Sequence, residues 1–415
     1  MRQHKYLLLH ALSKINELDF FAVADKDIDF LQNIYLKFSM EDAEQIKRIE
    51  HVTNHDVKAV EYFIKEKIKG SPWESKAEMV HFGLTSQDIN NTAIPLSLKD
   101  FLQEEFFPLL KSLQVNINVL AQSNKSQPML ARTHGQAASP TGFGKEIGVF
   151  AERMQKQILM LTQVPLEAKF GGATGNFNAH KLAFPNVEWK KFADDFTSKS
   201  FGLVRQQTTT QIEHYDSLAA LFDACKRINV ILLDFCKDIW AYVSMDYLKQ
   251  KIKKDEVGSS AMPHKVNPID FENAEGNLGM ANAIFIYMAE KLPLSRLQRD
   301  LTDSTVLRNL GVPFAHTVIA LLSIEKGLSK LEVNSAKMNE DLDNNWLVIA
   351  EAIQSILRRE HIEGAYERLK DFTRTGQKQN AETLVKFIDG LPVSDKVKNE
   401  LKQITPFNYT GYSTQ

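Results

Sequence analysis

The residues best suited to chemistry in this 415-residue chain lie in five dense clusters rich in Gly, Ser, Thr, His, Asn or Arg. The clusters occupy residues 53–56, 80–88, 132–145, 258–268 and 296–309. Hydroxyl, imidazole, ammonium and guanidinium groups can move protons or hold anions. Loops held on a rigid scaffold usually carry such groups. We therefore expect the functional site to be assembled from these clusters.

The cluster at 258–268 reads GSSAMPHKVNP and is the most distinctive of the five. Small residues and two serines come first, followed by Lys265, Asn267 and two prolines. Such a loop can move in its first part and is stiffened in its second, which is typical of a lid that closes over a site. An ordinary helix connection is the alternative, but it is usually shorter.

The second cluster places His134 beside a glycine in the run RTHGQ. We expect this histidine to precede a helix directly and to be partly exposed, so that it can titrate near neutral pH as an acid or base. The nearby run GFGKE superficially matches a phosphate-binding loop. That hypothesis fails because Glu146 follows Lys145 where Ser or Thr should bind magnesium, and because no strand is predicted before it.

The third cluster, at 53–56, is explained by helix capping. Thr53, Asn54 or Asp56 could cap the helix that follows. His51 and His55 stand four residues apart like paired zinc ligands. No HExxH pattern or cysteine pair completes a metal site, so we predict none.

The two remaining clusters could hold anions. At 80–88, hydroxyls and an acid stand where the N-terminus of a helix could bind an anion, although a simple capping box explains them equally well. At 296–309, Arg296, Arg299 and Arg308 flank Ser304. On a helix these arginines could fork onto carboxylate or phosphate oxygens, and the alternative is a surface salt-bridge network.

Long helices are expected to position these clusters. Glycine (19) and proline (13) are scarce and gathered at a few places, which predicts an all-α fold. Residues 216–250 contain neither and are apolar on nearly every face. A helix of that kind must be buried on all sides, so we predict a bundle shared between subunits. The core helix of one large monomer is the alternative.

Breaks in the helical pattern suggest three domains. We predict an N-terminal helical domain (1–84), a central long-helix bundle domain (85–327) and a small C-terminal helical domain (328–415). Further helices are expected at 109–126, 145–163, 280–292, 315–326 and 328–363.

Composition excludes several classes of protein. Lys and Arg (50) nearly balance Asp and Glu (52), which disfavours nucleic acid and anionic membranes as partners. Apolar runs are far shorter than the ~20 residues of a membrane span, and the first residues lack a signal-peptide pattern. Cys225 and Cys236 stand eleven residues apart, too far along one helix to pair. This usage suits a reducing cytosol, so we expect a cytoplasmic protein.

Taken together, the clusters resemble the fumarase/aspartase superfamily, whose members eliminate fumarate from a succinyl compound. The run GSSAMPHKVNP is specific to that superfamily. Combined with TNHD, HFGLTSQDIN, RTHGQ, TTQIE and RDLTDSTVLRN, it makes the chain similar to adenylosuccinate lyases of the bacterial purine-biosynthesis type. The resemblance covers nearly the whole chain.

The resemblance implies a homotetramer around a shared helical bundle, with each active site built from three subunits. It implies two small-molecule substrates, adenylosuccinate and succinyl-aminoimidazole-carboxamide ribotide. It also implies that no cofactor or metal is needed.

The resemblance also assigns roles to residues. Ser259 is implied to be the base and His134 the acid, supported by His55 and His81. Lys265 and Asn267 are implied to steady the succinyl carboxylates and the carbanion. The other implied substrate contacts are Asn54, Asp56, Thr85, Ser86, Gln211, Ser260, Asn273, Arg299, Ser304 and Arg308.

The chain departs from the family at its start, because bacterial relatives begin with a segment whose Arg-Tyr pair helps to hold the nucleotide phosphate. Two alternatives follow. Another fumarate-releasing lyase, argininosuccinate lyase or fumarase, usually carries Gln or Gly where His264 stands. A catalytically impaired structural oligomer is disfavoured by the intact Ser259, His134 and Lys265.

Overall fold

The computed structural model describes residues 2–15, 18, 25–251, 262, 266–373 and 379–414. The described chain is mostly helical, and its strands form three two-stranded sheets, which confirms the all-α prediction. The chain divides into two compact units, which we describe separately. Unit 1 comprises Met1–Pro108, Met160–Lys226 and Ala283–Val312, and unit 2 comprises Leu109–Leu159, Arg227–Asn282 and Pro313–Gln415. The predicted three domains divide the chain differently and stay a prediction.

Unit 1 is built from short elements around a core that includes the fully buried Trp73 and Phe63. Its described elements are α1 (Arg2–Leu12), α2 (Asp25–Leu36), α3 (Met40–Thr53), α4 (Asp56–Lys67), η2 (Glu74–His81), α5 (Ser86–Phe101), η3 (Leu102–Phe106), β3 (Glu167–Ala168), α8 (Asn178–Ala183), α9 (Trp189–Phe201), β4 (Val204–Arg205) and α12 (Thr302–Leu307).

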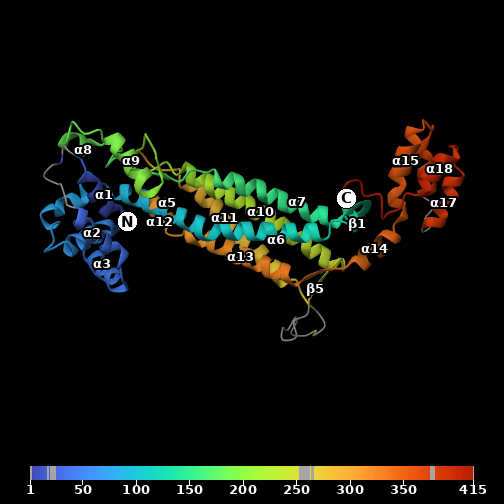
Figure 1. The fold of residues 1–415 in the computed structure, drawn as a ribbon, viewed down its shortest axis with the longest axis horizontal. Coiled ribbons are helices and arrows are strands. Elements are labelled where there is room, and N and C mark those ends of the chain that lie inside the picture. Colours follow the sequence, from blue (N-terminus) through green and yellow to red (C-terminus); the bar gives the residue numbers. More distant parts are fainter. Residues whose placement is uncertain are drawn as a thin grey trace. The chain divides into compact units, whose positions relative to one another are not determined.

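Unit 2 contains most of the long helices, which run alongside one another in Figure 1. They are α6 (Phe107–Ser123), α7 (Phe143–Thr162), α10 (Asp216–Ser244), α11 (Ile269–Lys291) and α13 (Gly311–Lys330), and some of their end residues belong to unit 1. A buried amide links three of them, because Asn229 of α10 donates to Asn282 (3.0 Å) and to Thr317 (3.1 Å). These five helices form the bundle.

The rest of unit 2 consists of short strands and a group of small helices near the C-terminus. The elements are β1 (Pro128–Thr133), β2 (Gln136–Gly142), β5 (Leu248–Gln250), β6 (Leu331–Val333), α14 (Ser335–Asp343), η4 (Trp346–Ile349), α15 (Ala350–Arg359), α16 (Ala365–Thr373), α17 (Ala381–Asp389) and α18 (Asp395–Lys402). The small helices pack on a core that includes Ile353, Leu357, Ile388 and Leu401.

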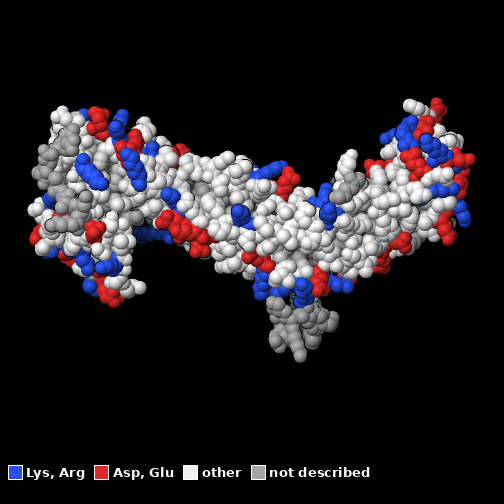
Figure 2. All heavy atoms as spheres, in the orientation of Figure 1, with Lys and Arg blue, Asp and Glu red and all other residues white. Residues whose placement is uncertain are grey.

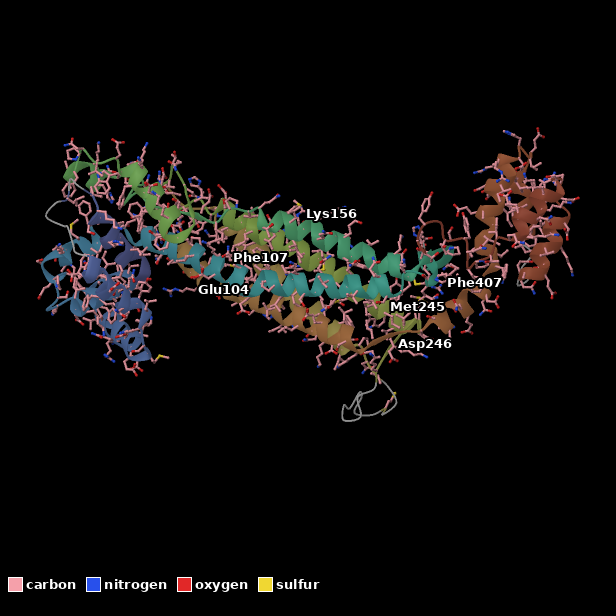
Figure 3. All side chains as sticks on the ribbon, viewed as in Figure 1. Glu104, Phe107, Lys156, Met245, Asp246 and Phe407 are labelled. Atoms are coloured by element: carbon pink, nitrogen blue, oxygen red, sulfur yellow. The ribbon has the colours of Figure 1, made fainter. Side chains whose placement is uncertain are left out.

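Helix α10 is shorter than predicted. We expected it to reach residue 250, but it ends at Ser244, just before Met245 and Asp246 (Figure 3). Asp246 adopts a left-handed conformation (φ 60°), which stops the helix. Leu248–Gln250 then pairs with β6, a partner distant in sequence.

The predictions for α11 and for residues 328–363 were partly wrong. Helix α11 begins at Ile269, well before the predicted start at residue 280. The predicted helix at 328–363 is instead the end of α13, strand β6 and three short helices. The break has a local cause, because the Asn334 side chain accepts the Lys337 N–H (3.4 Å) and caps α14.

Helix α10 is not buried on all sides within one copy of the chain. Val230 and Trp240 are both 49% exposed. The visible face of the bundle is mostly uncharged (Figure 2). Other bundle residues of unit 2 are also large, apolar and exposed, namely Val115, Val119, Val149, Leu159, Met280, Ile319 and Leu322. Exposed apolar residues in this number on one helical bundle favour an interaction surface.

Two sequence expectations concern the cysteines and membrane spans. Cys225 and Cys236 are both free and buried on α10, as predicted. Among the described residues, the stretch Thr302–Lys330 is long and apolar enough to cross a membrane by length and composition alone. The core helix of a soluble protein passes the same test, so this is weak evidence.

Candidate active site

The candidate residues of unit 1 gather around the first turn of α5. Thr85 precedes the helix with an extended backbone, and its N–H donates to the carboxylate of Asp88 (2.7 Å). This is the reach-back half of a capping box, which the sequence analysis offered as the simple explanation. The cap fixes Thr85 and Ser86 where the backbone N–H groups of the helix are unpaired.

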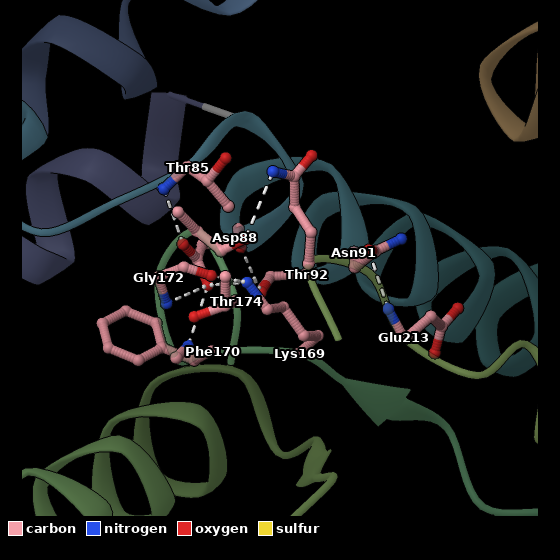
Figure 4. A network of polar contacts seen from close by, with 12 residues as sticks. Thr85, Asp88, Asn91, Thr92, Lys169, Phe170, Gly172, Thr174 and Glu213 are labelled. Carbon is pink, nitrogen blue, oxygen red and sulfur yellow. Dashed lines mark hydrogen bonds and ion pairs between the residues drawn. The ribbon is translucent and has the colours of Figure 1, made fainter. Parts of the chain in front are cut away.

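Asp88 also ties the first turn of α5 to the segment that begins at Lys169, as Figure 4 shows. Its buried carboxylate accepts hydrogen bonds from Lys169 Nζ (2.8 Å) and from the N–H groups of Gly171 (2.9 Å) and Gly172 (3.2 Å). Both members of the Asp88–Lys169 ion pair are completely buried. Burial lowers the pKa of Lys169, and the charge of Asp88 opposes that shift. A pair buried this deeply is stable only because the carboxylate is fully hydrogen-bonded.

His55 brings an imidazole to the same turn. Its Nδ1 accepts the N–H of Lys58 (3.2 Å), so in the neutral ring the proton is on Nε2. Nε2 lies 3.4 Å from the Ser86 hydroxyl oxygen. Nε2–H is therefore the donor to Ser86, which leaves the Ser86 hydroxyl free to donate to a ligand.

The neighbours of His55 are arranged differently from our expectation. The cap of α4 is His55 itself, not Thr53, Asn54 or Asp56. Asn54 is left-handed (φ 49°) and ends α3, so His51 and His55 do not share a helix. Within the described ranges, no group of three or more His, Cys, Asp or Glu residues could hold a metal ion.

His81 ends η2 and is half-buried, next to a tightly packed glycine. Gly83 has a positive φ (65°), and a Cβ added there would lie 2.4 Å from the imidazole of His180. Burial lowers the pKa of His180 to about 4. His180 packs against Trp189, with ring centroids 4.9 Å apart. Sequence reasoning missed His180, because only the folded aromatic cluster reveals the role of this histidine.

The arginine cluster also meets α5. Arg299 Nη2 donates to the Ser304 hydroxyl (3.1 Å) and lies 3.7 Å from the carboxylate of Asp303. Asp303 in turn lies at hydrogen-bond distance from Gln87 of α5 (3.5 Å). The Nε of Arg299 is buried and has no hydrogen-bond partner among the described residues. A guanidinium can fork onto the oxygens of an anionic ligand.

The other two arginines behave differently. Arg296 forms an exposed ion pair with Asp300 (3.0 Å), as the surface-network alternative predicted. Arg308 is exposed at the end of α12. The helix spans only Thr302–Leu307, so the three arginines do not share one helical face.

Gln211 reaches the loop that follows Lys169, because its side chain donates to the carbonyl of Ala173 (3.2 Å). Two residues later, the N–H of Glu213 donates to Asn91 of α5 (3.1 Å). The segment that carries Gln211 is thereby fixed to α5. Unit 1 thus brings together His55, Thr85, Ser86, Arg299 and Ser304 around one helix start, with the Gln211 segment tied to the same helix.

His134 of unit 2 lies at the tip of a β-hairpin, not directly before a helix as predicted. Strands β1 and β2 pair up to Thr133 and Gln136, which leaves His134 and Gly135 as a two-residue turn. Both turn residues have positive φ (52° and 75°), which is the geometry of a type I′ hairpin turn. The imidazole is exposed.

The remaining candidates of unit 2 lie at the start of α11 or before it. Asn273 is exposed and donates to Ser323 of α13 (2.7 Å). Asn267 is half-buried. Ser259, Ser260 and Lys265 lie outside the described residues, as does most of the predicted lid.

The arrangement in unit 1 offers an imidazole, hydroxyl groups and a guanidinium. Such a set can hold an anion and exchange a proton with it. The hairpin of unit 2 offers a second imidazole for proton transfer.

Comparison with known proteins places these residues in context. A family model described as lyase matches residues 3–283, and one described as adenylosuccinate lyase C-terminal matches residues 295–410. The adenylosuccinate lyase of Dictyostelium discoideum is 56% identical, covering 96% of this chain and 88% of its own. That of Escherichia coli K12 is 50% identical, covering 97% and 88%. That of Vibrio cholerae is 48% identical, covering 98% and 89%.

Solved structures share the fold at much lower identity. A fumarate lyase from Mesorhizobium has a TM-score of 0.77 at 17% identity, covering all of this chain and 92% of its own. A 3-carboxy-cis,cis-muconate lactonizing enzyme from Pseudomonas putida has a TM-score of 0.76 at 18% identity, covering 99% and 91%.

Proposed function

We propose that this chain, which belongs to the adenylosuccinate lyase family, releases fumarate from adenylosuccinate and leaves AMP. The chain is a lyase, and the bond broken is the one between the succinyl carbon and the purine nitrogen. The observation that carries the proposal is its similarity to adenylosuccinate lyases over nearly the whole chain.

The reaction needs a base, an acid and a clamp for negative charge. The base removes a proton from the carbon beside a carboxylate, and the resulting carbanion is held as an aci-carboxylate. Its electron pair then forms the new C=C bond as the C–N bond breaks. The acid protonates the departing nitrogen. Atoms and charge balance without an oxidant or a reductant.

Family resemblance assigns Ser259 as the base and Lys265 and Asn267 as contacts for the succinyl carboxylates. His134 is the proposed acid, and its exposed position lets it meet a ligand. In unit 1, the Ser86 hydroxyl and the Arg299 guanidinium would bind substrate oxygens. His55 orients Ser86 through its Nε2–H.

The proposal includes the second substrate, succinyl-aminoimidazole-carboxamide ribotide, because its succinyl group leaves by the same elimination. It also includes a homotetramer whose active sites are shared between subunits. The exposed apolar residues of the bundle support an assembly of copies. A cytoplasmic location is proposed as well, on the strength of the two free cysteines.

The test is to incubate the purified protein separately with adenylosuccinate, argininosuccinate and malate. Turnover is followed by absorbance and by identification of the products. We expect AMP and fumarate from adenylosuccinate and no turnover of the other two compounds. An intact oligomer that forms no AMP would refute the proposal, and turnover of argininosuccinate or malate alone would favour the corresponding lyase.

A variant tests the proposed base. Ser259→Ala should lower turnover by a factor of about 10² or more, because general-base catalysis typically contributes that much. AMP binding and the oligomeric state should be retained. Unchanged turnover would show that another group takes the proton.

A further inference from the structure

The substrate-binding segments of unit 1 meet at a buried tyrosine that the proposed mechanism does not use. Tyr215 is 1% exposed and directly precedes α10. Its hydroxyl donates to the carboxylate of Asp303 (2.9 Å) and accepts a hydrogen bond from the side-chain amide of Asn91 (2.9 Å). One hydroxyl thus joins three segments that are far apart in the sequence.

Each joined segment carries a proposed substrate contact. Asn91 lies on α5, whose first turn holds Ser86. Tyr215 ends the segment that contains Gln211. Asp303 accepts the backbone N–H of Ser304 (2.7 Å) and lies beside the guanidinium of Arg299.

The hydroxyl acts as a fixed donor. Burial and the charge of Asp303 raise the pKa of Tyr215 well above its ordinary value, so the hydroxyl keeps its proton at any physiological pH. Tyr215 also has a left-handed backbone (φ 62°), a conformation that is strained for a non-glycine residue. Strain of this kind persists only where the surrounding contacts fix the conformation.

We propose that Tyr215 is a positioning residue, which sets Arg299 and Ser304 for the substrate through Asp303 and holds them in register with α5 through Asn91. The inference rests on the proposed function, because these contacts are assigned to adenylosuccinate. Tyr215 itself touches no substrate.

The test compares Tyr215→Phe with Tyr247→Phe, a matched control in unit 2. Tyr247 is equally buried (1% exposed), and its hydroxyl donates to Asp341 (3.0 Å). Each variant removes a buried hydroxyl that donates to an aspartate, and Tyr215→Phe also removes the acceptor of the Asn91 amide, so both should lose stability. Only Tyr215→Phe should raise the KM for adenylosuccinate, by about tenfold, with kcat changed less than about twofold. An equal KM in the two variants would overturn the proposal.

A double-mutant cycle shows whether Tyr215 acts through Ser304. In a Ser304→Ala background, Tyr215→Phe should raise KM by clearly less than it does in the wild type, because the contact it positions is already gone. If the two substitutions raise KM independently, so that their factors multiply in the double variant, Tyr215 does not act through Ser304.

Hydrogen exchange separates this inference from the proposed function. In Tyr215→Phe, the backbone amides of Ser304 and Glu213 should exchange faster, since their acceptors Asp303 and Asn91 lose the Tyr215 hydroxyl. Tyr247→Phe should leave both amides protected. If the wild type does not cleave adenylosuccinate, the proposed function fails, and the exchange rates alone decide the positioning role. Unchanged exchange at both amides would refute it.

Discussion

In unit 1 the candidate residues are held in place by contacts with buried polar groups, whereas in unit 2 His134 lies in an exposed hairpin turn. Ser86 follows a cap fixed by the Asp88–Lys169 ion pair, and Arg299 is flanked by Asp303. The His134 imidazole is exposed, at the tip of the β1–β2 hairpin. Ser86 and Arg299, by contrast, are preorganised by the buried groups that support them. His134 needs surroundings that its own hairpin does not supply, which agrees with the proposal that active sites are shared between copies.

The largest expected effect concerns the exposed turn itself. His134→Asn should lower turnover about 10²–10⁴-fold, because it removes an acid while keeping a residue that suits a type I′ turn. The urea midpoint of unfolding should stay that of the wild type. A matching loss of stability would show that His134 supports the fold, and full activity would remove it from the mechanism.

Asp88 is the buried anchor of unit 1, and its substitution should strongly lower the stability of the folded protein. Asp88→Asn leaves the Lys169 charge buried without its counter-ion and should cost about 3–5 kcal/mol of unfolding free energy. The control is Glu400→Gln, which breaks the exposed Arg359–Glu400 pair (2.6 Å) and should leave the urea midpoint unchanged. Equal losses in the two variants would mean that burial does not distinguish them.

The glycine beside His81 gives a smaller, graded effect. Gly83→Ala places a Cβ 2.4 Å from His180 at a positive φ, whereas Gly70→Ala (φ 73°) meets no atom within 4 Å. Gly70→Ala should cost about 1 kcal/mol from the backbone alone, and Gly83→Ala about 1–3 kcal/mol more from overpacking. Thermal unfolding of both variants measures the difference in stability. Equal unfolding midpoints would show that the His180 ring can move away from the added Cβ without loss of stability.

The last expected effect is a dependence of stability on pH, which develops gradually. His180 has a pKa of about 4 in the folded state and about 6.5 unfolded, so the unfolded chain binds the proton first as the pH falls. The stability contributed by neutral His180 is complete above pH 6.5 and is lost progressively toward pH 4. Between pH 7.5 and 5 the loss should be about 2 kcal/mol.

The variant His180→Leu isolates this contribution. Urea unfolding at pH 7.5 and pH 5 should show a smaller pH-dependent loss in the variant than in the wild type, whatever its absolute stability. Parallel pH dependences would mean that His180 takes up its proton as readily in the folded protein as in the unfolded chain.

The sequence predicted the parts of this site that depend on local chemistry. The capping box at Thr85 and Asp88 and the helical fold could be read from neighbouring residues. The partners of those residues could not. Lys169 pairs with Asp88 across 81 residues, and Tyr215 meets Asp303 across 88. Only the packed chain defines such contacts. The His134–Gly135 turn did carry a local signal, because a residue that tolerates positive φ followed by glycine favours a hairpin.

The most direct test of the account mixes two inactive proteins. His134→Asn lacks the proposed acid of unit 2, and Ser86→Ala combined with Arg299→Ala lacks the substrate contacts of unit 1. Each should be nearly inactive toward adenylosuccinate alone. After joint unfolding and refolding, hybrid oligomers should regain AMP formation, because some sites then combine an intact part from each copy. A mixture as inactive as its two parents, with hybrid oligomers present, would contradict the shared site.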